Sequence, residues 1–299
     1  MEERDEAVIE ASSPLPGTRA TLGGLGPAAV LPLGPGAFGR LALRLGSRTG
    51  DRPVMALSTL TAPSGQPNGG PLPPPVARFR ELALRDGPPV VETVAIECSA
   101  TMRRPRMPRI PLRIRMFHRV GRAFVHDIRM GAGPFSFRMG LDAYVDGHGL
   151  MKIGPSVQTG VEFDQGALIA LWGEALGFPS AWEGRDDVRW EPVDDVTALL
   201  VVEGPEGEIP ITVGFDPATG CPAFCEADRY KSKGPKVRWR GASSDWRRFE
   251  GSVLAPGRFS AAWADEPYPW LEIRIDSLRV NVPVDDRLDE GRAAFPRSA

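Results

Sequence analysis

The sequence has little cysteine, and the little it has excludes a disulfide framework. Only Cys98, Cys221 and Cys225 are present in 299 residues, a number both small and odd. Cys221 and Cys225 are spaced C-x-x-x-C, but a zinc site would need about four converging ligands. We therefore expect the cysteines to pack as small buried residues, and we expect no bound metal and no cofactor.

A strong net charge and long apolar runs are missing as well. The 36 basic and 38 acidic residues give a formal net charge of −2, a balance that does not attract nucleic acid. No apolar run approaches the ~20 residues that span a bilayer, and the acidic start of the chain is unlike a secretory signal. We expect a cytoplasmic protein with no nucleic-acid partner and no transmembrane segment. No pattern in the sequence indicates an oligomeric state.

A formal G-x-G-x-x-G at residues 34–39 raises the question of dinucleotide binding. That fingerprint requires a strand before it, a long helix after it and an acidic residue about 20 positions further on. Pro32 and Pro35 disrupt the strand and the turn, and the next apolar run ends without an acidic residue. We interpret residues 21–61 as a Gly/Pro-rich segment that follows a disordered N-terminus at residues 1–20.

The main domain is predicted to begin after a linker at residues 62–75, APSGQPNGGPLPPP. A short helix follows, and then apolar residues recur at every second position, which is typical of half-buried antiparallel strands. Asp146-Gly147 between two such runs predicts a tight hairpin. This pattern continues over residues 76–284, and the polar residues 285–299 are expected to form a loose tail.

One strong helix interrupts the strands, at about residues 164–177. Asp164 is a suitable N-cap, and Pro179 prevents the helix from continuing. An open sheet of about ten strands tends to curl. We therefore predict a mainly β (α+β) fold: one large curved antiparallel sheet, or half-barrel, with one or two helices packed in its hollow.

From Leu72 to Val280 the chain resembles an uncharacterised bacterial family. The stretches that carry the resemblance are LPPPVARF, LDAYVDGHG, DQGALIALWGEALGFP, VRWEPVDDVTALL, VGFDPATG and DWRRFEG. Its strand order also resembles the half-barrel of lipoprotein carriers of the LolA type, which implies an apolar concave groove partly plugged by helices. The resemblance further implies an acidic residue at the position of Glu174. Carriers of the LolA type are exported, and this chain departs from them at its acidic start.

The candidate ligand-binding residues are apolar side chains expected to face the hollow. Phe137, Met139 and Leu141 alternate along one strand and should share its inner face, and Trp172 lies on the helix that enters the hollow. Trp190 is placed at the rim. The alternative is that these side chains only fill the core between helix and sheet.

The candidate catalytic residues are carboxylates. Glu174 diverges from Trp172 by ~200° along a helix, so an inward Trp172 places Glu174 at the rim or in solvent. Asp194 and Glu174 could serve as acid and base. His118 and His126 lie on neighbouring predicted strands, and one hypothesis makes them cross-strand neighbours; the alternative is that each is an ordinary core or surface histidine. Arg138 and Asp142 are expected to form a solvated surface pair.

These observations leave three readings of function. The preferred one is a protein that binds an apolar small molecule or lipid tail in the concave face of the sheet. The second is an enzyme, for example a cyclase, isomerase or hydrolase, that acts on an apolar metabolite with Glu174 or Asp194 as acid/base. The third is an interaction module whose hollow is fully packed. A hollow filled by side chains favours the third hypothesis, and an open, wholly apolar hollow favours the first. An open hollow with one buried carboxylate of raised pKa favours the enzyme.

Overall fold

The computed structural model describes residues 70–131 and 136–296. The G-x-G-x-x-G stretch at residues 34–39, the predicted segments 1–20 and 21–61, and most of the predicted linker lie outside the described residues. No helix within the described ranges is long and apolar enough to cross a membrane.

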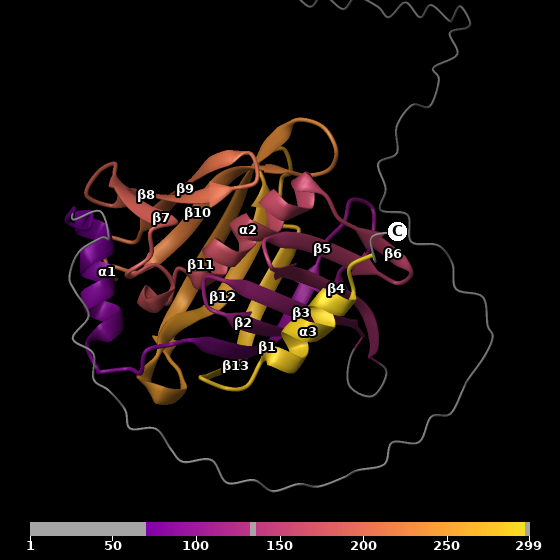
Figure 1. The fold of residues 1–299 in the computed structure, drawn as a ribbon, viewed down its shortest axis with the longest axis horizontal. Helices are drawn as coiled ribbons and strands as arrows, with labels where there is room; N and C mark the ends of the chain where they lie inside the picture. Colours follow the sequence, from indigo (N-terminus) through magenta and orange to yellow (C-terminus); the bar gives the residue numbers. More distant parts are fainter. Residues whose placement is uncertain (1–69, 132–135, 297–299) are drawn as a thin grey trace, which may run out of the picture. The chain divides into compact units, whose positions relative to one another are not determined.

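The described residues form one curved antiparallel sheet of thirteen strands, so the predicted mainly β fold is confirmed (Figure 1). Their spatial order is β6-β5-β4-β3-β2-β1-β13-β12-β11-β10-β9-β8-β7. The chain therefore builds one half of the sheet outward from β1 to the edge strand β6. It then crosses to the other edge and returns from β7 to β13, which pairs with β1.

The strands follow one another in two meanders. The first meander comprises β1 (Thr93–Met102), β2 (Ile110–Arg119), β3 (Ala123–Met130), β4 (Phe137–Val145), β5 (His148–Ile153) and β6 (Ser156–Gln158). The second comprises β7 (Val188–Pro192), β8 (Thr197–Gly204), β9 (Gly207–Phe215), β10 (Pro222–Tyr230), β11 (Lys236–Arg248), β12 (Leu254–Trp263) and β13 (Leu271–Val280). The helical elements are α1 (Pro74–Leu84), α2 (Val161–Ala175), η2 (Pro179–Ala181), η3 (Glu250–Ser252) and α3 (Asp285–Ala293).

Local chemistry explains the turn that joins β4 to β5. Asp146 and Gly147 both have positive φ, 54° and 85°. Two consecutive positive φ values are the mark of a type I′ turn, whose twist matches that of antiparallel strands. The predicted hairpin is therefore present, with Val145 and His148 paired across it.

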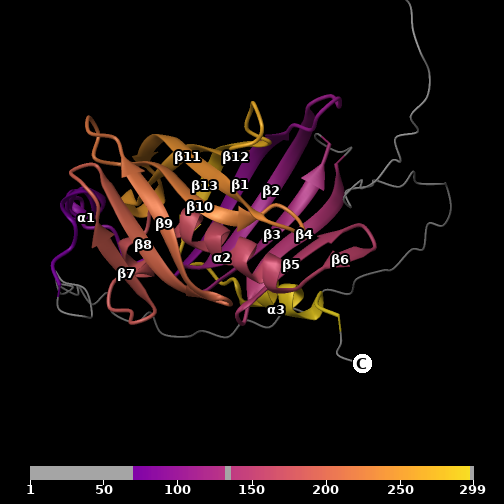
Figure 2. The ribbon, with the colours of Figure 1, turned by 90° about the horizontal axis from the view of Figure 1, so that it is seen from above.

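Helix α2 connects the two edges of the sheet and lies in its hollow, between β3–β6 on one side and β7–β10 on the other (Figure 2). It begins at Val161, three residues before the predicted start, because Gly160 with a φ of 122° occupies the N-cap. Asp164 lies in the first turn, and its carboxylate accepts a hydrogen bond from the Gly149 amide at 2.7 Å. This carboxylate therefore ties the helix to β5.

The predicted loose tail is wrong for residues 285–293, which form α3. Leu288 is buried, and Gly291 approaches the outer face of β3 and β4 so closely that a Cβ there would lie 2.6 Å from a Val125 methyl carbon. Leu288, Val284 and the strand residues Val125 and Leu141 share a second apolar cluster. Packing on the sheet stabilises this helix, whose own sequence is polar.

Candidate functional site

A small cavity lies between α2 and the inner face of the sheet. Its volume is about 60 Å³, and its wall combines the C-terminal end of α2 with residues of β1, β2 and β10–β13. Most lining side chains are apolar, and Glu174 and Ser243 are the polar ones; the Ser243 hydroxyl and the Trp246 ring N–H both donate to the Pro222 carbonyl. The lining residues are Ile96, Met116, Gly173, Glu174, Leu176, Gly177, Phe178, Phe224, Cys225, Gly241, Ser243, Trp246, Ala255, Pro256, Phe259, Ile273, Ile275 and Leu278.

Gly173 allows α2 to approach this part of the sheet. A Cβ on Gly173 would lie 3.2 Å from the sulfur of Cys225, tighter than most carbon contacts. A Cβ on Gly177 would lie 3.6 Å from the ring of Trp246, which is an ordinary van der Waals distance. Gly173 therefore lets the helix lie close to β10, because a side chain there would press on Cys225, whereas Gly177 follows the end of α2.

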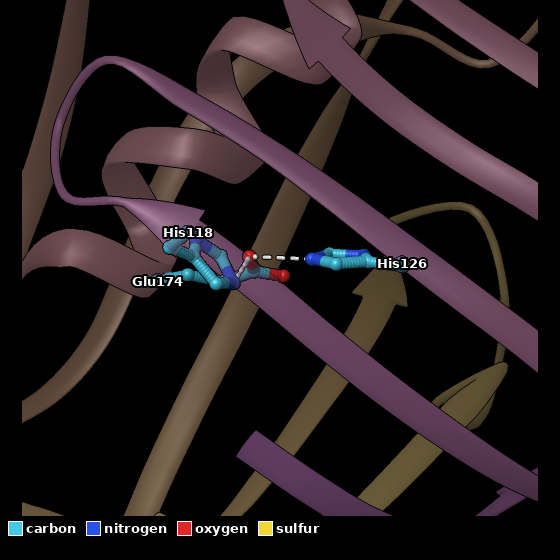
Figure 3. A group of neighbouring side chains, drawn as sticks. All are labelled: His118, His126 and Glu174. Atoms are coloured by element: carbon cyan, nitrogen blue, oxygen red, sulfur yellow. Dashed lines mark ion pairs between the residues drawn. The ribbon is translucent and has the colours of Figure 1, made fainter. Parts of the chain in front are cut away.

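Glu174 reaches from α2 to two histidines on the sheet. Its Oε2 lies 3.2 Å from Nε2 of His126 and 3.5 Å from Nε2 of His118 (Figure 3). Only 6% of the His118 side chain and 7% of the His126 side chain are exposed. The candidate site is therefore a buried carboxylate between two buried imidazoles, adjoining the apolar cavity that Glu174 also lines.

Strand alternation places the two histidines on the inner face. Leu112, Ile114, Met116 and His118 are the buried residues of β2, and they alternate with more exposed ones. In the ladder between β2 and β3, His118 pairs with Phe124 and His126 pairs with Met116. The histidines are thus diagonal neighbours, with ring centroids 5.3 Å apart. The hypothesis that they are cross-strand neighbours is confirmed in this diagonal form.

The electrostatics of the cluster favour an ionised Glu174. Burial lowers the pKa of His118 to about 4, so this imidazole is neutral at pH 7. Burial also disfavours the charged form of His126, but Glu174 and Asp142 raise its pKa above the ordinary value. Burial disfavours charge on Glu174 too, while the two histidines and Arg229 hold its pKa below the usual range.

Asp142 and Arg229 complete the polar surroundings. Asp142 is the direct cross-strand partner of His126, and its Oδ2 lies 3.9 Å from Nδ1 of that ring. Burial raises the pKa of Asp142. The guanidinium of Arg229 on β10 lies over the ring of Trp239 at 5.4 Å, and its Nε is buried without a hydrogen-bond partner among the described residues.

The predicted pairing of Arg138 with Asp142 is wrong. Arg138 instead pairs with Asp127 at 2.9 Å and with Glu290 of α3. The reason is an irregularity in β4, where Gly140 pairs with Ile128 and Arg138 pairs with the next residue of β3, leaving Met139 unpaired. This bulge turns Arg138 and Asp142 to opposite faces of the sheet.

The same bulge separates the predicted wall residues of β4. Met139 packs against the inner apolar cluster, Leu141 belongs to the outer cluster beneath α3, and Phe137 is 47% exposed. Trp172 and Trp190 are both buried in the inner core, so Trp190 does not lie at a rim. None of these five side chains is among the residues that line the cavity.

The two candidate carboxylates are not brought together. Asp194 is exposed in the turn between β7 and β8, where it accepts a hydrogen bond from the Val196 amide at 2.9 Å. Glu174 is half-buried, with 20% of its side chain exposed, and its Oε2 points to the two histidines rather than into solvent. Asp142 is the carboxylate that shares its surroundings, and the sequence signal for it was its place opposite His126 on the next strand.

Comparison with known proteins finds one matching family model, described as "Family of unknown function (DUF6544)", over residues 65–273. No match to a curated protein is found. Among solved structures, the chain is similar to the LolA superfamily protein NE2245 from Nitrosomonas europaea. The identity is 10%, the match covers 72% of this chain and 95% of that one, and the TM-score is 0.43.

Two further solved structures give similar values. A putative outer membrane lipoprotein-sorting protein domain from Vibrio parahaemolyticus is 7% identical over 67% of this chain and 90% of that one, with a TM-score of 0.41. A DUF1329 family protein from Desulfovibrio piger is 13% identical over 75% and 100%, also with a TM-score of 0.41. At these identities and TM-scores the likeness does not extend to a ligand or an activity.

Proposed function

The chain belongs to DUF6544, a family of unknown function, and we propose that it binds a small apolar molecule between α2 and the inner face of the sheet. The observation that carries this proposal is the cavity beneath α2, whose lining is mostly apolar and includes the carboxylate of Glu174. Ligand sites of this kind combine an apolar wall with a few placed polar groups.

The volume of the cavity limits the size of the molecule that fits between α2 and the sheet as they lie in the structure. A site for a drug-sized ligand has a volume of roughly 300–1,000 Å³, whereas this cavity has about 60 Å³. The cavity therefore accommodates the end of an apolar molecule, and a longer chain such as a lipid tail requires α2 to move away from β10–β12.

Glu174 gives the bound molecule an orientation. It lines the cavity and is held by two histidines, so its carboxylate is a fixed acceptor at one end of an apolar wall. An apolar molecule with one hydroxyl, amine or amide group would place that group at Glu174 and its hydrocarbon part along Ile273, Ile275 and Leu278.

Native mass spectrometry tests the proposal on protein purified without detergent from its own host. We expect an adduct of a few hundred daltons that is lost on denaturation. The Gly177→Leu variant fills the cavity and should weaken binding of an uncharged fluorescent probe with an N–H donor, N-phenyl-1-naphthylamine, by about 10-fold or more. Gly177→Ala is the matched control, because its methyl group meets Trp246 at an ordinary distance. A bare mass together with equal binding by both variants would contradict the proposal and favour the packed interaction module.

A second candidate function is an enzyme that acts on an apolar metabolite. The observation that favours it is the placement of Glu174, which adjoins the cavity and contacts a neutral His118 and the more basic His126. In that case Glu174→Gln would abolish turnover of the molecule found by mass spectrometry. Under binding alone, the same variant would leave its affinity nearly unchanged.

The cytoplasm is the compartment that we propose, without a nucleic-acid partner. All three thiols are free, as a reducing compartment would keep them. Fractionation of the host with an antibody to the chain tests this, and recovery with periplasmic or secreted proteins would contradict it.

A further inference from the structure

We infer that His118, His126 and Glu174 form a binding site for a divalent transition-metal ion such as Zn²⁺. The ligand atoms are Nε2 of each histidine and Oε2 of Glu174, which lie within 4.8 Å of one another (Figure 3). This inference does not depend on the proposed ligand of the cavity, because the three residues and their neighbours carry it by themselves.

The distances fit one ion among the three atoms. Zinc lies at about 2.0–2.1 Å from nitrogen and oxygen ligands in tetrahedral sites, so neighbouring ligand atoms are ~3.4 Å apart. Glu174 Oε2 lies 3.2 Å and 3.5 Å from the two Nε2 atoms. The two Nε2 atoms lie within 4.8 Å of each other, so the histidine rings must approach by up to about 1.4 Å for one ion to reach bonding distance from all three atoms.

All three ligand atoms are buried and unsatisfied. Within the part of the chain that the structure describes, Nε2 of His118, Nε2 of His126 and Oε2 of Glu174 have no hydrogen-bond partner of proper geometry. A buried polar atom without a well-formed partner is unfavourable. The 3.2 Å contact between Glu174 and His126 offsets part of that cost, whereas Nε2 of His118 lies 3.5 Å from the carboxylate. A single cation bound to all three removes that cost.

Asp142 lies near the other ring nitrogen of His126, at an ion-pair distance that must shorten for a hydrogen bond. A metal-binding histidine commonly donates its other ring N–H to a carboxylate, which fixes the tautomer that directs a lone pair at the ion. Asp142 Oδ2 lies 3.9 Å from Nδ1 of His126, on the side of the ring away from Glu174. Among the described residues, the charged groups that interact with Glu174 besides the histidines are the Asp142 carboxylate and the Arg229 guanidinium. With both carboxylates ionised, the net charge of the cluster is negative and favours a bound cation.

The ligand set selects the class of ion. Two imidazoles and one carboxylate suit Zn²⁺, Co²⁺, Fe²⁺ or Ni²⁺, whereas Mg²⁺ and Ca²⁺ prefer sites made wholly of oxygen. Three protein ligands leave at least one coordination position open, as in sites where the metal meets a water or a bound molecule. Glu174 and Met116 also line the cavity beneath α2, so the open position is adjacent to it.

The sequence analysis predicted no metal site because the three residues follow no ligand spacing. The two histidines are on different strands, and Glu174 is on a helix that follows three further strands. Only the return of α2 into the hollow brings the carboxylate to the histidine pair. The signal present in the sequence was weak: one histidine on the apolar face of each of two adjacent predicted strands.

Direct metal binding tests the inference with the full chain and with Zn²⁺ and Co²⁺ alone as probes. After treatment with a chelator and dialysis, the wild-type protein should take up one Zn²⁺ per chain. With Co²⁺ it should show the visible absorption of a site with nitrogen and oxygen ligands. Glu174→Gln and His118→Ala should each weaken Zn²⁺ binding at least ~100-fold, and Asp142→Asn about 10–100-fold with a shifted Co²⁺ spectrum.

His148 offers a matched control, because it is the one other histidine of the chain and its side chain is 68% exposed. His148→Ala should bind Zn²⁺ as the wild type does. Should the histidine variants fail to fold, X-ray absorption of the zinc-loaded wild-type protein decides the matter, since two imidazoles and an oxygen ligand are expected. A wild-type chain that takes up no stoichiometric Zn²⁺ or Co²⁺, or a loss of binding on His148→Ala, would overturn the inference and leave an ion pair of Glu174 with His126.

Discussion

At the scale of single residues, burial determines the chemistry of the three cysteines. Cys98, Cys221 and Cys225 are each 2–3% exposed, and none forms a disulfide. Burial raises the pKa of all three thiols, and that of Cys225 to about 12. The reactive thiolate is therefore scarce at neutral pH.

We predict that these thiols react very slowly with a disulfide reagent in the folded protein. The shift in Cys225 alone lowers its thiolate fraction by roughly 10³-fold, and burial further blocks access. The rate of reaction with 5,5′-dithiobis(2-nitrobenzoate) at pH 8 measures this, with urea-unfolded protein as the control in which three thiols react. One thiol reacting rapidly in the native state would contradict the described burial.

Glu174 shows which residue-scale features the sequence could not reveal. Helical geometry correctly separates its direction from that of Trp172, but both side chains are enclosed, because buried residues occur around most of the circumference of α2. A helix that is apolar on nearly all sides is covered on nearly all sides. The identity of Glu174 as a candidate was therefore predictable, whereas its two histidine partners depend on how α2 lies over β2 and β3.

At the scale of elements, alternation predicted strands well and failed where a strand is irregular. β2 keeps the expected alternation of buried and exposed residues, and β13 keeps it as far as Asp276, where its pairing with β1 shifts and the next buried residue is Leu278. In β4 the bulge at Met139 changes which face each later residue occupies, so Phe137, Met139 and Leu141 do not share a wall. A bulge leaves no periodic signal, because the extra residue is set by pairing with the neighbouring strand.

The helix α3 supports a prediction about stability. Replacing the buried Leu288 with alanine should lower the free energy of unfolding by about 2–5 kcal/mol, since a cavity opens between α3 and the outer face of β3 and β4. Asp289→Ala is the control on the exposed side of the same helix and should cost less than about 0.5 kcal/mol. Urea denaturation followed by tryptophan fluorescence measures both. Equal effects of the two substitutions would show that α3 adds no packing to the sheet.

At the scale of the whole molecule, the centre of the sheet pairs the first described strand of the chain with the last one. Val94 of β1 pairs with Val280 of β13, whereas every other neighbouring pair of strands is also consecutive in sequence. The two meanders consist of local hairpins, and their junction is the pairing of greatest sequence separation. The cost of closing a loop grows with its length, so this pairing is the least favoured to form early.

We predict that the β1–β13 pairing forms late in folding. Pulse-labelling hydrogen exchange during refolding should find amide protection in the β3–β4 and β8–β9 hairpins before protection between β1 and β13, because local contacts form faster than distant ones. The two hairpins within one experiment serve as internal references. Simultaneous protection of β1, β13 and these hairpins would contradict the prediction.

Because β1 and β13 are paired, the start of the first strand lies beside the end of the last one. The Asn281 amide donates a hydrogen bond to the Thr93 carbonyl at 2.7 Å, and the Thr93 hydroxyl donates to the Val282 carbonyl at 2.7 Å. The start of the first strand and the end of the last are thus in contact, while α2 links the two edges. A circular permutant in which a short linker joins the end of β13 to the start of β1, and whose new termini lie at the Asp146–Gly147 turn, would keep every strand pair of the sheet.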